Sequence, residues 1–236
     1  MPVEQYRLAW WRRWLARPFL RVVLRTLFYI LAPIKITGKN NVPLRTPYIA
    51  AINHVSLFEA PFVGVFWPEQ LEALGASDVW ERPGQNILAR MWGGIPVHRG
   101  DYDRAAMDGV VTALRSGSPL LMAPEGGRSH KPGMQLAKPG IAFIIEQTGL
   151  PVVPVAIVGT TDDFFKKASK GRRPQLEMHI GKPFHLPPID GKGTERRESR
   201  QRNADLVMRH IAGLLPENYR GVYAGNAIFP DPEPGK

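Results

Sequence analysis

The chain contains no cysteine among its 236 residues. It therefore forms no disulfide bond, and it can use neither a thiolate nucleophile nor a zinc–thiolate site. The absence is compatible with a reducing compartment such as the cytoplasm. If the protein carries out nucleophilic chemistry through a side chain, serine is still available for that purpose.

The sequence also lacks a secretory signal and a long apolar run. Its first residues, 1–6, are followed by Trp and Arg, and no apolar stretch with a cleavage site appears. A transmembrane helix needs about 20 largely apolar residues. The best N-terminal candidate, 18–33, carries Arg21 and Arg25, and its uncharged part, 26–34, is too short to span a bilayer. We therefore expect a chain that lies on a membrane if it meets one.

Acidic residues are in the minority, since 31 Lys and Arg against 21 Asp and Glu give a formal net charge of +10. A basic surface attracts polyanions such as nucleic acid, anionic lipid or phosphorylated substrates. The chain has no helix-turn-helix, zinc-ligand or RNA-binding aromatic signature, so we do not expect nucleic acid among its partners. Its length suits one domain with a short appendage.

Residues 6–32 differ in composition from the rest of the chain. They include three tryptophans within five residues, and arginines at positions 13, 17, 21 and 25. Residues four apart are neighbours on a helix, so these arginines form a stripe, and Pro18 is suited to begin a second helix. Trp-rich amphipathic helices of this kind suit the headgroup region of a bilayer, where basic residues attract anionic lipid. We expect 1–41 to be a membrane-docking segment. The alternative is a helical hairpin packed on the domain with solvated arginines.

From residue 42 onward, short apolar runs alternate with helical stretches. The pattern predicts strands at 48–52, 94–97, 120–123 and 152–158, an edge strand at 175–180, and helices at 58–66, 104–115, 140–147 and 199–215. This alternation favours an α/β fold with a mostly parallel sheet flanked by helices. We assign 42–229 to one domain and the Pro-rich end, 230–236, to a disordered tail.

The first block that could carry chemistry follows the predicted strand 48–52. His54 would lie at the carboxyl end of that strand, where α/β sheets place their ligand sites. An imidazole there can take a proton from an alcohol if a carboxylate such as Glu59 orients it. The two positions do not share a face of one continuous helix, so the pairing requires a helix that begins after His54, with Ser56 as its N-cap. Alternatively, Ser56 and Glu59 form only a capping box.

The second block, 93–100, ends a short predicted strand with Arg99 beside a glycine. A guanidinium in this place can hold a phosphate with two hydrogen bonds, although a surface arginine at a turn is also common.

The third block, 124–129, follows the apolar strand at 120–123. Gly126 and Gly127 allow the backbone to come close to a ligand, and Arg128 can bind an anion. Glu125 can bind hydroxyl groups or anchor an arginine. An ordinary turn with a solvated ion pair is the alternative for this block taken alone.

The order and spacing of these blocks together resemble the glycerolipid acyltransferase superfamily, which includes the 1-acylglycerol-3-phosphate O-acyltransferases. That family has an asparagine, a histidine and then an acid after four further residues, as in Asn53, His54 and Glu59. Its second block ends in arginine, its third has the form of 124–129, and its fourth is an apolar stretch with proline like 152–155. The resemblance covers residues 47–157.

The resemblance implies that an acyl thioester, on coenzyme A or acyl carrier protein, donates a fatty acyl group to a lysophospholipid acceptor. His54 and Glu59 would be catalytic, Arg99 and Arg128 would hold the acceptor phosphate, and Glu125, Gly126 and Gly127 would bind the substrate. No metal and no further cofactor are expected. The resemblance also implies a peripheral or monotopic protein on the cytoplasmic face of a bacterial inner membrane.

The chain departs from the family at two positions. Glu59 stands where the family usually has aspartate, which changes the reach to the imidazole, and Gly127 stands where threonine is usual. These departures leave three readings open: acylation of 1-acylglycerol-3-phosphate, the same chemistry on another lysolipid or on glycerol-3-phosphate, and a lipid-binding membrane protein without catalysis.

Overall fold

The computed structural model describes residues 8–98 and 104–230, and these residues form a seven-stranded sheet in the order β1-β7-β6-β2-β5-β3-β4. Neighbouring strands run parallel except for β6 and β7, which are antiparallel. The strands are β1 (Ile34–Thr37), β2 (Ile49–Ile52), β3 (Glu72–Ala76), β4 (Ile95–Val97), β5 (Leu120–Met122), β6 (Val152–Val158) and β7 (Leu176–Ile180). The predicted α/β fold with a mostly parallel sheet is confirmed.

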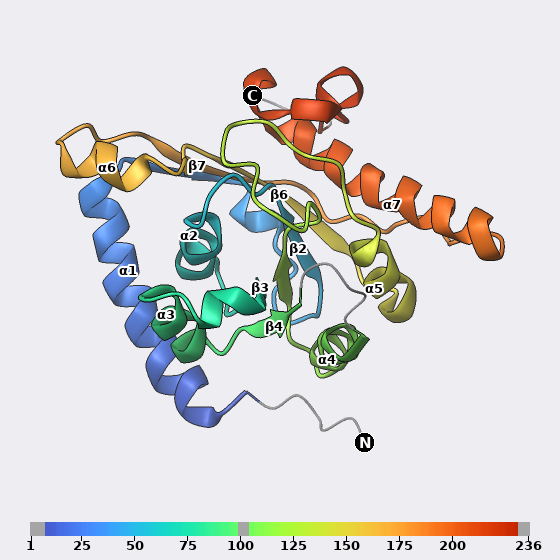
Figure 1. Cartoon of the computed structure of the whole chain (residues 1–236), viewed down its shortest axis with the longest axis horizontal. Coiled ribbons are helices and arrows are strands. Elements are labelled where there is room, and N and C mark those ends of the chain that lie inside the picture. The colour runs from blue at the N-terminus through green and yellow to red at the C-terminus, as the bar shows by residue number, and fades with distance from the viewer. Residues whose placement is uncertain (1–7, 99–103, 231–236) are drawn as a thin grey trace.

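Helices cover both faces of the sheet (Figure 1). The helices α1 and α2 lie on one side, and α4, α5 and α7 lie on the other. The α-helices are α1 (Arg17–Leu31), α2 (Glu59–Phe66), α3 (Gln85–Trp92), α4 (Arg104–Arg115), α5 (Gly140–Thr148), α6 (Phe164–Ser169) and α7 (Gly193–Leu214). Shorter helical turns are η1 (Arg12–Ala16), η2 (Lys39–Asn41), η3 (Ser77–Trp80), η4 (Glu217–Tyr219) and η5 (Gly221–Asn226).

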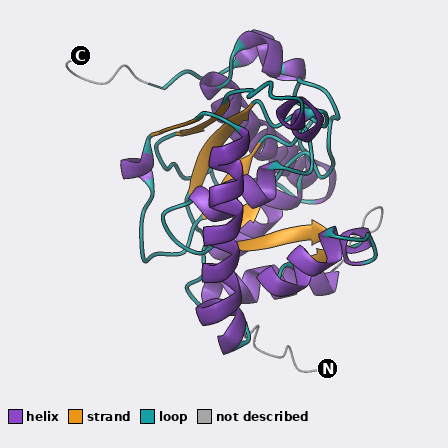
Figure 2. Ribbon diagram, turned by 90° about the vertical axis from the view of Figure 1, so that its left-hand side faces the viewer, coloured by secondary structure: helices purple, strands orange, loops and turns teal. Residues whose placement is uncertain are grey.

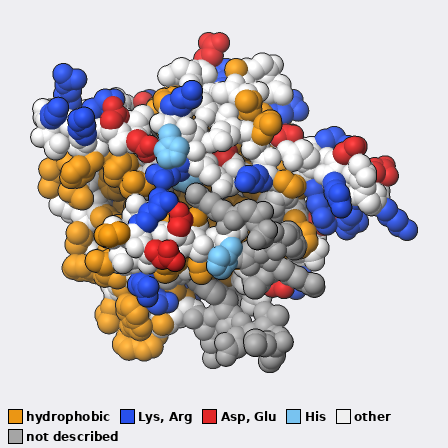
Figure 3. Space-filling view, viewed as in Figure 1, with side chains coloured by type: hydrophobic (Ala, Val, Ile, Leu, Met, Phe, Trp, Pro, Cys, Tyr) orange, Lys and Arg blue, Asp and Glu red, His pale blue; other side chains and the backbone are white. Residues whose placement is uncertain are grey.

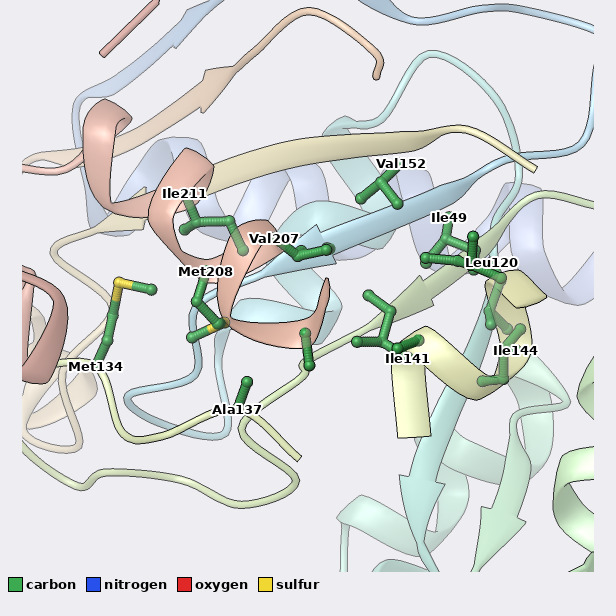
Figure 4. Close-up of a cluster of buried hydrophobic side chains, with 14 of the residues drawn as sticks. Ile49, Leu120, Met134, Ala137, Ile141, Ile144, Val152, Val207, Met208 and Ile211 are labelled. Atoms are coloured by element: carbon green, nitrogen blue, oxygen red, sulfur yellow. The ribbon is translucent and has the colours of Figure 1, made fainter. Parts of the chain in front are cut away.

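Two apolar clusters, one on each face of the sheet, form the core. On one face, Ile49, Leu120 and Val152 of the central strands pack against α5 and α7, as Figure 4 shows. On the other face, buried aromatic side chains of α1 and α2 pack against the same strands. Because the central strands are buried on both faces, they read as continuous apolar runs in the sequence. This burial is why the strands at the middle of the sheet were predictable.

The prediction of an edge strand at 175–180 was wrong in its position. This strand, β7, lies between β6 and β1, and β1 forms the edge. The strand β1 has only four residues, in a half-exposed alternating pattern, and it was not predicted. The sheet therefore includes residues 34–37 from within the predicted docking segment 1–41. The predicted tail, 230–236, lies outside the described residues from 231 onward.

The N-terminal helix turns its arginines toward the domain, which corrects the expectation that they face lipid or water. Arg17 is buried and forms an ion pair with Glu72 of β3. Arg21 donates to the backbone carbonyl of Trp67, and Arg25 donates to that of Val65 at 3.1 Å. These carbonyls belong to the C-terminal end of α2, which has a partial negative charge and accepts hydrogen bonds that the helix itself cannot supply.

The opposite side of the same helix is apolar and exposed. Figure 2 shows α1 running across the front of the molecule, and in Figure 3 apolar side chains gather along that side. The exposed residues there are Trp10, Trp11, Trp14, Leu15, Phe19, Val22, Val23, Leu27, Tyr29 and Ile30. We call these residues the outer face of α1. Pro18 stands in the first turn of α1, but the π-helical turn η1 precedes it without a break, so the prediction that a second helix begins at Pro18 was wrong. Within the described residues, no helix has the length and hydropathy to cross a membrane.

Candidate active site

Three loops meet at the carboxyl edge of the sheet, each following one of the adjacent parallel strands β6, β2 and β5. The register pairs Ala50 with both Leu121 and Val153, so the three strands end side by side. His54 follows β2, the block 124–129 follows β5, and Thr160 follows β6. Ligand sites of open α/β sheets occur at this edge. The fold therefore brings together the first and third blocks, as the sequence predicted.

His54 and Glu59 are in contact. The imidazole Nδ1 lies 3.0 Å from the carboxylate Oε2, and the side chain of Glu59 is 0% exposed whereas that of His54 is 20% exposed. The contact is possible because α2 begins only at Glu59, which leaves His54 in the preceding turn. The N-cap of α2 is Phe58, so the expectation that Ser56 would cap the helix directly was wrong.

The carboxylate of Glu59 binds Ser56 as well as facing His54, so the contacts of both readings occur although Ser56 is not the N-cap. The backbone amide of Ser56 donates to Glu59 Oε1 and Oε2 at 3.0 and 2.9 Å, and its hydroxyl lies 3.2 Å from Oε1. The hydroxyl of Thr160 donates to Oε1 at 2.5 Å. A carboxylate accepts hydrogen bonds only, so the proton shared with His54 belongs to Nδ1. The other imidazole nitrogen, Nε2, then has its lone pair available to receive a proton.

The backbone at His54 is fixed by its neighbours. The side-chain amide of Asn53 donates to the carbonyl of Ile157 at 3.0 Å and accepts from the amide of Ile157 at 2.7 Å, which joins the end of β2 to β6. The third block holds the other side, since the amide of Ser129 donates to the carbonyl of His54 at 2.9 Å. His54 therefore stands on a loop whose position is set by both neighbouring strands.

Glu125 contributes to this fixation through its carboxylate. Its two carboxylate oxygens accept hydrogen bonds from the backbone amides of His54 and Gln135, each at 2.8 Å. The side chain is buried, and burial raises the pKa of the Glu125 carboxyl to about 7, although the two amides oppose the shift. With both oxygens engaged by amides, Glu125 positions the loop of His54, and its contact with substrate hydroxyls stays a prediction.

The two glycines of the third block differ in what they require. Gly126 has a φ of +67°, and a side chain there would meet Lys138 at 2.8 Å, so glycine is needed. At Gly127 a side chain would meet nothing within 4 Å. The hydroxyl that relatives of the family usually have at this position could therefore be accommodated here. Its absence leaves open space beside the block.

Arg128 is mostly buried, and its nearest acidic neighbour is Asp162. The side chain is 18% exposed, and its Nη1 lies 4.0 Å from Asp162 Oδ1. The other oxygen of Asp162 lies 2.8 Å from Nδ1 of His130. The guanidinium is thus held at the carboxyl edge of the sheet, where it can reach an anionic substrate group. Arg99, the other predicted phosphate ligand, lies outside the described residues.

Sequence reasoning missed two side chains that touch this site, Thr160 and Asp162. Both follow the predicted strand 152–158 at its carboxyl end, and the rule that placed His54 there applies to them equally. The described residues hold no cluster of three or more side chains suited to bind a metal ion. The site contains the imidazole of His54, the buried carboxylate of Glu59 and the neighbouring guanidinium of Arg128.

Comparisons with known proteins agree with this geometry. A family model described as Acyltransferase matches residues 33–158, which is more than half of the chain. The chain is 29% identical over 187 residues to a 1-acyl-sn-glycerol-3-phosphate acyltransferase of Limnanthes douglasii, covering 73% of this chain and 64% of that protein. It is 28% identical over 155 residues to a protein of the same name from Borreliella burgdorferi, covering 64% and 62%.

Solved structures contain the same fold. The crystal structure of the 1-acyl-sn-glycerophosphate (LPA) acyltransferase PlsC from Thermotoga maritima superposes with a TM-score of 0.58 at 22% identity, covering 83% of this chain and 79% of that chain. The human 1-acyl-sn-glycerol-3-phosphate acyltransferase alpha is 22% identical, and the match covers 61% of its length. The chain spans about three fifths of the length of the curated relatives it matches.

Proposed function

Because the chain belongs to the Acyltransferase family, we propose that it transfers a fatty acyl group from an acyl thioester to the free hydroxyl of 1-acylglycerol-3-phosphate. The product is phosphatidic acid, and the thiol of coenzyme A or acyl carrier protein is released. The observation that carries the proposal is the His54–Glu59 contact of 3.0 Å at the carboxyl edge of the sheet. No metal and no cofactor besides the donor takes part.

In the proposed reaction, Nε2 of His54 takes the proton of the acceptor hydroxyl while its oxygen attacks the thioester carbonyl carbon. The new C–O bond forms a tetrahedral intermediate, and the C–S bond then breaks. The leaving thiolate takes the proton back from the imidazolium, so no acyl-enzyme is formed. Glu59 stabilises the imidazolium, as the carboxylate of a catalytic triad does. Arg128 and Arg99 hold the acceptor phosphate through bidentate hydrogen bonds.

The first test is acyl transfer from a labelled acyl-CoA, and in parallel from acyl carrier protein, to 1-acylglycerol-3-phosphate in mixed micelles. We expect labelled phosphatidic acid and an equal amount of free thiol. Product with another lysolipid or with glycerol-3-phosphate alone would correct the acceptor, for which the open space at Gly127 gives room. If no acyl transfer occurred with any acceptor and either donor, the proposed catalytic function would be wrong and lipid binding without catalysis would be favoured.

We further propose that the outer face of α1 rests on a bilayer, on the cytoplasmic side of a bacterial inner membrane. Such a continuous exposed apolar surface is unusual for a protein with no partner. Positive charge near it comes from the exposed Arg13 of η1 and from α6 with the loop after it, because the arginines of α1 face inward. Lys166, Lys167, Lys170 and Arg172 surround a hollow of about 240 Å³, with Asp163 as the acidic residue there. Arg173 joins α6 to the end of α1 through the carbonyl of Tyr29, at 2.8 Å.

We expect the outer face of α1 and the basic residues around α6 to contribute separately to vesicle binding. Changing Phe19, Val22 and Ile30 to Ser should weaken binding to all vesicles by about 100-fold or more, since each buried large side chain contributes about 1.5–3 kcal/mol. Changing Lys166 and Lys170 to Gln should weaken binding about 30-fold on vesicles with phosphatidylglycerol, at about 1 kcal/mol per cation. The lysine variant should bind uncharged phosphatidylcholine vesicles unchanged. Flotation at fixed salt measures both.

A matched control is available on α7, on the other side of the molecule (Figure 1). Arg197 and Arg202 are exposed there, and changing both to Gln removes the same charge. This control should bind anionic vesicles like the wild type. If the control and the Lys166/Lys170 variant lost equal affinity for anionic vesicles, the effect would be one of net charge alone and not of the position of these lysines. A dimer that the outer-face changes split would assign that face to a second copy of the chain.

A further inference from the structure

Thr160 is a buried polar residue that the proposed reaction does not yet use. Its side chain is 1% exposed, and its hydroxyl donates to Glu59 Oε1 at 2.5 Å across 101 residues of sequence. It lies beyond residue 158, where the match to the family model ends. The contact links the loop after β6 to the catalytic loop after β2, two segments that meet only because those strands are neighbours.

The backbone before Thr160 is shaped to deliver this hydroxyl. Gly159 has a φ of +93°, and a Cβ there would lie 2.1 Å from the carbonyl oxygen of Gln175. Only glycine can occupy such a position. The Gly159 amide also donates to the hydroxyl of Tyr219 at 3.1 Å. The turn at the end of β6 is therefore fixed in the conformation that directs Thr160 at Glu59.

The two carboxylate oxygens of Glu59 accept hydrogen bonds from different sets of donors. Oε2 accepts from the Ser56 amide and faces the imidazole, whereas Oε1 accepts from Thr160 and from the Ser56 amide and hydroxyl. Ser56 lies three residues away and moves with the same turn. Thr160 is the contact that comes from a different strand, so it fixes the rotation of the carboxylate relative to the rest of the site.

We propose that Thr160 is a positioning residue, which holds the Glu59 carboxylate so that His54 keeps its proton on Nδ1 and offers Nε2 to the acceptor hydroxyl. The proposal rests on the proposed function for its kinetic consequence. Its structural consequence, the tautomer of His54, is independent of turnover.

The test compares Thr160→Val, Thr160→Ser and Thr160→Ala in the full chain. Removal of one hydrogen bond to a charged group should lower kcat roughly 10- to 100-fold with KM for the acceptor unchanged. Thr160→Ser keeps the hydroxyl, so its kcat should lie within about threefold of the wild type. This decrease is much smaller than the one expected when the hydrogen bond is removed. Thr160→Ala guards against misfolding of the valine variant, because it removes the hydroxyl without adding an apolar group.

The matched control is Thr161→Val. Thr161 is the next residue, and its hydroxyl lies 2.6 Å from Asp163 Oδ1, away from Glu59. This variant should keep the wild-type kcat. Retention of wild-type kcat by both Thr160→Val and Thr160→Ala would overturn the proposal, and so would a Thr160→Ser variant that is folded but as slow as Thr160→Val.

A spectroscopic measurement of the His54 tautomer distinguishes a loss of Glu59 positioning from a general loss of structure. In protein labelled with ¹⁵N-histidine, the His54 signals, identified by their loss in His54→Ala, should show a proton on Nδ1. In Thr160→Val that signal should shift toward a mixture of the two tautomers, and in Thr161→Val it should not. An unchanged tautomer in Thr160→Val would overturn the proposal. If the wild type lacks acyl transfer, the proposed function fails while this measurement still decides the role of Thr160.

Discussion

Replacement of His54 by Ala is expected to lower kcat by roughly 10³-fold or more, since general-base catalysis commonly contributes about 10²- to 10⁴-fold. The loss should appear in kcat, because Arg128 and the loop backbone that would hold the acceptor remain in place. The measurement is steady-state acyl transfer from a labelled thioester, together with thermal unfolding. The melting temperature should change little, since the side chain of His54 is 20% exposed at the edge of the sheet.

Two companion variants sharpen this expectation. Glu59→Gln keeps the shape of the side chain but cannot stabilise an imidazolium, so kcat should fall less than in His54→Ala and far more than in a surface variant. His185→Ala, which alters an exposed histidine outside the site, should leave kcat unchanged. Substantial turnover by His54→Ala would remove the histidine from the role of base and direct attention to a serine nucleophile.

Replacement of Arg17 by Met is expected to destabilise the protein by about 3–5 kcal/mol, the usual cost of breaking a buried ion pair from one side. Arg17 holds Glu72 through both carboxylate oxygens, one at 3.1 Å and one at 2.5 Å, and the two side chains are only 1% and 4% exposed. Its Nε also donates to the carbonyl of Trp92 at 2.8 Å. For a chain of this size the melting temperature should fall by roughly 10 °C. Thermal or denaturant unfolding measures the change.

Arg25 offers a matched control on the same helix, since it donates to a backbone carbonyl of α2 and not to a carboxylate. Arg25→Met should cost about 1 kcal/mol. The double variant Arg17→Met, Glu72→Met removes both charges, and it should recover most of the stability because buried pairs are often replaceable by apolar side chains. A single Arg17→Met variant as stable as Arg25→Met would show that this pair does not hold the N-terminal helix to the sheet.

The central part of the fold and the pairing of His54 with Glu59 could be predicted from the sequence. The strands β2, β5 and β6 are buried on both faces, so their apolar runs stand out, and parallel strands end at one edge. A block that follows such a strand is placed by that rule alone. The spacing of the two residues left the contact open beside a capping box, and the resemblance to the acyltransferase family favoured the contact.

The orientation of the N-terminal helix could not be predicted in this way. The spacing of the arginines shows that they share a stripe, but it does not show whether the stripe faces water or protein. That depends on Glu72 of β3 and on the last carbonyls of α2, which lie 40 to 55 residues away in the sequence. The strand β3 begins with this buried glutamate, so its own sequence did not resemble a core strand, and it was missed.

Thr160 escaped prediction for a related reason. Its contact with Glu59 requires both the neighbouring positions of β6 and β2 and the sharp turn at Gly159, and no local pattern contains that information. The inner position of β7 likewise depended on β1, a four-residue strand too short to identify. In each case the missing information was a partner that is distant in sequence.

The hydrogen bonds between α1 and α2 also affect where the chemistry would occur relative to a membrane. Arg21 and Arg25 fasten the C-terminal end of α2, and the first residue of α2 is Glu59. The helix α2 also packs along α1, since Phe28 contacts both Phe62 and Phe66, so α1 fixes the position of α2 and of the His54–Glu59 pair at its start. If α1 rests on lipid, its depth in the bilayer sets the height of His54 above the membrane surface. The reaction plane would then be determined by the way one short helix packs on α1.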